Sequence, residues 1–180
     1  RLPVSMTDLD AAFAAVNTSA TGVITPAEVQ AALALGGLTL SRPQAALLVK
    51  LYDVNKNGGV DRGEFGALHA YLDVLVTAHA AAAAGAAGRD GVDLDAAAAI
   101  LKAKAGITLD RPPLAAAFDA FDADGSGVLS KVELIGMACF LSASLSVFKA
   151  FAAAEGGGAG GGGTISLTRD QFIYAAASCR

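Results

Sequence analysis

The apolar residues of this chain recur at helical spacing, in segments separated by polar or glycine-rich stretches. Leu9, Phe13 and Val16 share one face of a predicted helix, because residues three and four positions apart lie on the same side. Pro26 and Pro43 fit the first turns of two further helices, where a proline removes no intrahelical hydrogen bond. The pattern therefore predicts an all-α protein.

Two of the predicted helices are long. The segment from Ala67 to Ala84 contains neither Gly nor Pro. Phe65 precedes it, and Leu68 and Leu72 lie within it at helical spacing. The uncharged stretch from Leu134 to Phe148 is shorter than the roughly 20 apolar residues that a membrane span needs. We therefore predict a buried helix for this second stretch.

The segment DVNKNGGVDRGE, residues 53–64, lies between two of these predicted helices. Ca²⁺ prefers six to eight hard oxygen ligands, which a loop of this length supplies from alternate side chains, one backbone carbonyl and a final two-oxygen carboxylate. Gly58 stands where such a loop turns sharply, and Val60 stands where it pairs with a neighbouring loop. The predicted calcium ligands, in loop order, are Asp53, Asn55, Asn57, Gly59, Asp61 and Glu64. This spacing predicts an EF-hand calcium loop.

Two further segments repeat the pattern. DADGSGVLSKVE, residues 122–133, supplies the predicted ligands Asp122, Asp124, Ser126, Val128, Ser130 and Glu133. NTSATGVITPAE, residues 17–28, offers Asn17, Ser19, Thr21, Val23, Thr25 and Glu28 as a weaker set. The side chains of this first loop carry one formal charge, and those of each other loop carry three. Because ligand charge tunes calcium affinity, we expect the first loop to bind most weakly.

Composition narrows the functional classes. The chain has 180 residues and a formal net charge of −4, so we expect no nucleic-acid surface, which would need clustered Lys and Arg. Its two cysteines, Cys139 and Cys179, do not form a disulfide framework. We therefore expect a reduced, cytoplasmic protein.

The chain repeats itself with an offset of 69 residues, since GLTLSRP at 37–43 matches GITLDRP at 106–112. Each repeat should hold a pair of hands, which places the partner of the fourth hand near residues 85–97. Asp90, Gly91, Val92 and Asp93 preserve part of the loop pattern there, but the first ligands and the closing Glu are missing. We interpret this third hand as one that keeps its shape and has lost its metal.

A fifth hand is predicted near the C-terminus. Thr164-Ile165-Ser166 matches the middle of a loop, and Phe172 and Tyr174 match the start of the following helix. Residues 155–163 are mostly Gly and carry no spaced oxygens, so this loop is not expected to bind calcium. The predicted hands then span about residues 8–35, 44–72, 72–103, 113–141 and 145–178 of a single domain.

Five successive hands resemble the penta-EF-hand family. The long helix shared by the second and third hands, and the seven-residue step from Ile165 to Phe172, favour this family over four-handed proteins. The resemblance implies hands paired 1–2 and 3–4, with an unpaired fifth hand that makes a homodimer or heterodimer. The apolar residues left without an internal partner, and hence the expected interface, are Phe148, Phe151, Ile165, Phe172 and Tyr174.

Three functional hypotheses follow. The leading one is a calcium sensor or adaptor that exposes an apolar surface to target peptides or membrane-associated partners, moving reversibly to membranes. The alternatives are the regulatory subunit of a calpain-like cysteine protease and a passive calcium buffer. We expect no enzyme, because His69 and His79 are too far apart along one helix to act together. Cys139 lies among apolar residues and is expected to be a small buried hydrophobe.

Overall fold

Helices make up nearly all the regular structure of the described chain. The computed structural model describes residues 9–35, 37–85, 91–155, 168–170 and 172–173. Within these ranges the elements run in the order α1 Leu9–Val16, β1 Val23–Ile24, α2 Pro26–Leu35, α3 Arg42–Tyr52, β2 Val60–Asp61, α4 Arg62–Gly85, α5 Leu94–Ile100, the π-helical turn η1 Leu101–Ala105, α6 Arg111–Phe121 and α7 Lys131–Glu155. The predicted all-α class is confirmed.

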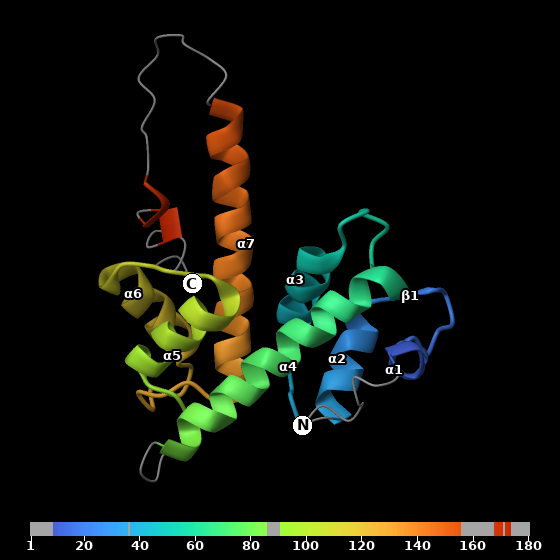
Figure 1. Ribbon diagram of the computed structural model, residues 1–180, viewed down its shortest axis with the longest axis horizontal. Helices are drawn as coiled ribbons and strands as arrows, with labels where there is room; N and C mark the ends of the chain where they lie inside the picture. The colour runs from blue at the N-terminus through green and yellow to red at the C-terminus, as the bar shows by residue number, and fades with distance from the viewer. Residues whose placement is uncertain (1–8, 36, 86–90, 156–167, 171, 174–180) are drawn as a thin grey trace.

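Two long helices organise the molecule (Figure 1). α4 crosses it from the group formed by α1, α2 and α3 to the group formed by α5 and α6. α7 packs against α3, α4 and α6, so it contacts both groups. α4 follows the second loop, and α7 follows the fourth. The second and fourth loops therefore each lead directly into a helix that connects different parts of the fold.

The loops meet in pairs through short backbone bridges. β1 and β2 are antiparallel, with Val23 opposite Asp61 and Ile24 opposite Val60. Val92 and Leu129 form an isolated antiparallel bridge, with N···O distances of 2.9 and 2.7 Å. These contacts confirm that the first loop pairs with the second and the degenerate third with the fourth.

Local sequence signals explain where several helices begin and end. Ser41 and Gln44 form a reciprocal capping box at the start of α3, and Asp93 accepts a hydrogen bond from the Ala96 amide at the start of α5. Gly106, at φ 65°, ends η1 in the left-handed conformation that glycine tolerates best. The π-helical turn itself was not predicted from the sequence.

The core is continuous across the helices. Leu134, Ile135, Met137 and Leu141 on α7 are almost completely buried. By length and apolar composition alone, segments 62–84 and 131–148 are also long enough to cross a membrane. Their inward faces pack into this protein core, which is the behaviour predicted for residues 134–148.

The small described part of the fifth hand packs back onto the rest of the chain. Phe172 contacts Phe148 of α7 at a ring-centroid distance of 6.0 Å, and Ile173 is fully buried. These two rings therefore have a partner within the chain, which corrects the expectation that they lack one. Of the other predicted interface residues, Ile165 and Tyr174 lie outside the described residues, as does the side chain of Phe151.

The contact between the third and fourth hands yields a stability prediction. A Cβ atom on Gly91 would lie 2.8 Å from Val128 Cγ2 and 3.0 Å from the Leu129 carbonyl oxygen. Gly91→Ala should therefore force the two loops apart and lower the free energy of unfolding by about 1–3 kcal/mol in urea titration.

Gly66→Ala is the matched control. A Cβ there would meet only the tip of the Leu9 side chain, at 3.1 Å, inside a helix that favours Ala over Gly. The control should unfold at the same urea concentration as the parent or a higher one. Equal stability of Gly91→Ala and the parent would show that the two loops are not in tight contact.

Candidate calcium-binding loops

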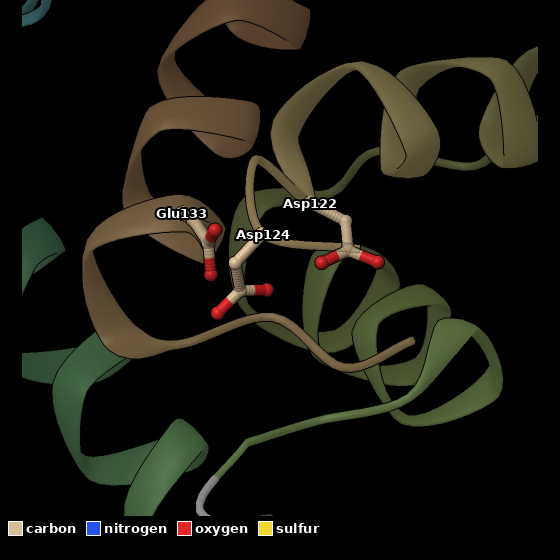
Figure 2. Close-up of side chains that lie close together, drawn as sticks. All are labelled: Asp122, Asp124 and Glu133. Atoms are coloured by element: carbon tan, nitrogen blue, oxygen red, sulfur yellow. The ribbon is translucent and has the colours of Figure 1, made fainter. Parts of the chain in front are cut away.

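The fourth loop brings three carboxylates together. Asp122 follows the last residue of α6, Asp124 lies in the loop, and Glu133 lies in the first turn of α7. One carboxylate oxygen of each lies within 4.8 Å of those of the other two. Figure 2 shows the three carboxylates arranged around a common space beside the loop. Among the described residues, no other group of three acidic, histidine or cysteine side chains meets this closely.

Hydrogen bonds from the loop backbone hold these carboxylates in place. Asp122 accepts from the amides of Ser126 at 3.0 Å and Gly127 at 2.8 Å. Glu133 reaches back to accept from the amides of Ala123 at 3.1 Å and Ser130 at 2.9 Å. Glu133 therefore ties the first turn of α7 to the chain just after α6.

The donor set of this loop fits a hard divalent cation. It combines three carboxylates with the Ser126 hydroxyl and the Val128 carbonyl, all of them oxygen ligands that Ca²⁺ prefers. The Ser126 hydroxyl donates to the Val128 carbonyl oxygen at 2.8 Å, so both oxygens lie on one side of the loop. Hydrogen bonds from the hydroxyl and amide of Ser126 lower the pKa of Asp124, an exposed carboxyl of this loop.

The second loop repeats this arrangement. Asp53 accepts from the amides of Asn57 at 2.9 Å and Gly58 at 3.0 Å. Glu64, in the first turn of α4, accepts from the amides of Val54 at 2.8 Å and Asp61 at 3.0 Å. The backbone hydrogen bonds of residues 53–64 thus match those of residues 122–133, but the carboxylates of Asp53, Asp61 and Glu64 do not converge as closely as those of the fourth loop.

A shared backbone shape supports the loop assignment. The sixth residue of each loop has a positive φ: 85° at Gly22, 91° at Gly58 and 74° at Gly127. The fourth residue is also left-handed, at 52° for Ala20, 60° for Lys56 and 66° for Gly125. The glycine at the sixth position predicts its positive φ from the sequence alone. The positive φ at the fourth position was not predicted, because Ala and Lys rarely adopt this conformation.

The first loop has the same backbone but different chemistry. Glu28 is buried, and its carboxylate accepts hydrogen bonds from the amides of Ser19 and Thr25, both at 2.8 Å. The hydroxyls of Thr25, at 2.8 Å, and Thr18, at 3.3 Å, donate to it as well. Burial raises the pKa of Glu28, but hydrogen bonds from Thr25 and Ser19 outweigh this effect and lower the pKa to about 2. The carboxylate is therefore charged and already well satisfied.

The third hand uses its acidic side chains for other contacts. Asp93 caps α5, and Asp95 forms an ion pair with Arg111 of α6 at 2.9 Å. Asp90 lies outside the described residues. The bridge from Val92 to Leu129 is consistent with a third hand that keeps its shape, and its loss of metal stays a prediction.

Two histidines that the sequence placed on the long helix are buried in the structure. His79 Nε2 lies 3.0 Å from the Leu129 carbonyl oxygen, so α4 contacts the bridge between the third and fourth hands. Cys139 is buried as expected, and burial raises the pKa of its thiol to about 12, which makes it a poor nucleophile. No sequence signal pointed to the contact of His79.

Comparisons with known proteins agree with the loop geometry. The EF hand family profile matches residues 114–138, which include the fourth loop. The Penta-EF hand domain-containing protein 2 of Dictyostelium discoideum is 38% identical over 63 residues, which are 35% of this chain and 30% of that protein. The matched region thus spans under a third of the length of that curated relative.

Structural similarity covers more of the chain. The structure of a homolog of programmed cell death 6 protein from Leishmania major Friedlin matches 95% of this chain and 92% of that chain. The TM-score is 0.59 and the sequence identity is 24%, so this match concerns the fold. Together with the sequence matches, it shows that the chain has an EF-hand fold and is similar, over 63 residues, to a penta-EF hand protein.

Proposed function

We propose that this protein is a calcium sensor that presents a target-binding surface when its second and fourth loops bind calcium. The main support is the cluster of Asp122, Asp124 and Glu133, whose oxygens converge at the start of α7. Carboxylates this close repel one another, and a divalent cation offsets that repulsion. Residues 122–133 and 53–64 would hold one ion each, through the ligands predicted from the sequence.

The glutamate at the last position of each of these loops links the helix before the loop to the helix after it. Glu64 joins the first turn of α4 to the amide of Val54, just after α3, and Glu133 joins α7 to the amide of Ala123, just after α6. When these carboxylates turn from backbone amides towards a cation, the helices that carry them change direction. Sensor hands use such movement to open an apolar groove.

The helices that would move are in contact. The ring of Tyr52, next to the loop residue Asp53, lies 5.8 Å from that of Tyr71 on α4. The Tyr71 hydroxyl lies 3.5 Å from the Ser142 hydroxyl on α7. A movement of the helices at either loop therefore changes the contacts among Tyr52 on α3, Tyr71 on α4 and Ser142 on α7.

A groove along α4 is our candidate for the target surface. It follows one face of the helix from Asp73 to Ala82 and is also bounded by Lys104 of η1. Val74 in this face is 37% exposed. The small apolar side chains here would suit a hydrophobic or proline-rich peptide, the targets that the family resemblance implies.

Self-association through the fifth hand is part of the same proposal. Val147, next to Phe148 near the described part of this hand, is 45% exposed although it is a large apolar residue. An isologous contact between two fifth hands would bury such a surface.

Calcium titration tests the sensor proposal directly. The parent should bind calcium at both charge-rich loops, and Glu64→Gln or Glu133→Gln should each remove or strongly weaken one site in calorimetry, because Gln cannot act as a two-oxygen anionic ligand. Calcium should increase the fluorescence of an apolar dye with the parent, and the double variant should give no increase.

Asp95→Asn provides the control for removing a carboxylate. Asp95 is exposed, lies outside both charge-rich loops and forms a surface ion pair, which contributes little to stability. Its calcium binding and dye response should equal those of the parent. Tight calcium binding with no change in dye fluorescence would leave a passive buffer and contradict the sensor proposal.

Sedimentation at micromolar concentration tests the dimer. The parent should sediment as a dimer, and Val147→Glu should shift it towards monomer by placing a charge in the proposed interface. Leu35→Glu is the control, since Leu35 is 85% exposed at the end of α2. A monomeric parent would refute this part of the proposal.

A further inference from the structure

The closing glutamate of the first loop differs from its two counterparts in the groups that donate to it. Glu64 and Glu133 accept hydrogen bonds from backbone amides of their loops. Glu28 accepts from two amides and also from the hydroxyls of Thr18 and Thr25. Neutral donors within the chain thus surround a carboxylate that, in a calcium loop, would face the cation.

The other predicted ligands of this loop are also engaged with one another. The Ser19 hydroxyl donates to Asn17 Oδ1 at 3.3 Å and lies 3.1 Å from the Thr21 hydroxyl. The Thr21 hydroxyl in turn donates to the Val23 carbonyl oxygen at 3.0 Å, as Ser126 does to Val128 in the fourth loop, so this bond does not distinguish the two loops. Glu28 is the one acidic residue of the loop. A single carboxylate gives little compensation for the dehydration of a divalent cation.

The same network fixes the strand that pairs with the second loop. Thr25, which donates to Glu28 through both its amide and its hydroxyl, directly follows β1. In β1, Val23 lies opposite Asp61, a predicted calcium ligand of the second loop. The approach is close, because a Cβ on Gly59 would lie 2.9 Å from the Ile24 carbonyl oxygen. A change in the position of β1 would therefore displace Gly59 and Asp61.

We propose that Glu28 is a positioning residue for the calcium site of residues 53–64 and is not itself a calcium ligand. Hydrogen bonds from its own hydroxyls hold the first loop in one conformation. Through the pairing of β1 with β2, this loop orders the second loop before calcium binds. This inference rests on the proposed function, because it assigns a role to Glu28 in calcium binding by the neighbouring loop. It replaces the weak first site expected from the sequence.

Paired variants isolate each site in calorimetric calcium titrations. In the Glu133→Gln background, residues 53–64 are the remaining charge-rich loop, so adding Glu28→Gln should weaken that site about fivefold or more while keeping one bound ion. In the Glu64→Gln background, residues 122–133 remain, and adding Glu28→Gln should leave their affinity within about twofold. The parent should bind two ions per chain.

Far-UV circular dichroism establishes that each variant is folded. If Glu28→Gln is not, Thr18→Val takes its place, because it removes one donor to Glu28 from an exposed position that is not a predicted ligand. It should weaken calcium binding at residues 53–64 about twofold or more in the Glu133→Gln background, with one ion still bound.

Two results would overturn the inference. One is a parent that binds three ions and loses one when Glu28 is replaced, since Glu28 would then be a ligand. The other is an unchanged affinity at residues 53–64 when Glu28→Gln, or Thr18→Val in its place, is added to Glu133→Gln. A parent that binds no calcium would refute the proposed function itself, which distinguishes the two failures.

Discussion

Hydrogen bonds between loop amides and a glutamate in the first turn of the next helix hold each of the three loops in shape. Glu28, Glu64 and Glu133 each accept hydrogen bonds from the amide of the ninth loop residue and from donors near the loop start. Buried or loop-facing carboxylates must be compensated, by hydrogen bonds or by a cation. A loop whose carboxylate is satisfied by hydrogen bonds alone is a fixed structural element. A loop whose carboxylates need a cation responds to calcium.

Each described pair of hands joins one loop with three acidic predicted ligands to a different kind of loop: the first loop has one acidic residue, and Asp93 and Asp95 of the third hand cap α5 and pair with Arg111. The bridge from Val23 to Asp61 joins the first loop to the second, and the bridge from Val92 to Leu129 joins the third hand to the fourth. In the first pair, the proposed role of the first loop is to order its neighbour, while that neighbour supplies the carboxylates. α4 and α7 then carry any change at the charge-rich loops into the contacts among α3, α4 and α7.

The sequence was sufficient for features that follow from side-chain spacing. The loops, their pairing and the long helix after Phe65 all follow from oxygen-bearing residues at fixed intervals and from helical periodicity. Features that depend on tertiary contacts were missed. The left-handed Lys56, the π-helical turn before Gly106 and the contact of His79 with Leu129 have no local signature.

The packing of Phe148 against Phe172 shows the same limit. An odd number of hands suggested that both rings lack an internal partner, but these two residues, 24 positions apart, are in contact. In the first loop, the low charge was evident from the sequence, but the convergence of hydroxyls on Glu28 was not. Only the three-dimensional arrangement shows that these hydroxyls satisfy the carboxylate.

Anomalous scattering from crystals grown with calcium would locate each bound ion, and so would show which loops bind calcium. We expect one peak inside residues 53–64 and one inside residues 122–133, beside Glu64 and Glu133. Crystals of the folded protein with no peak in either loop at millimolar calcium would contradict this expectation.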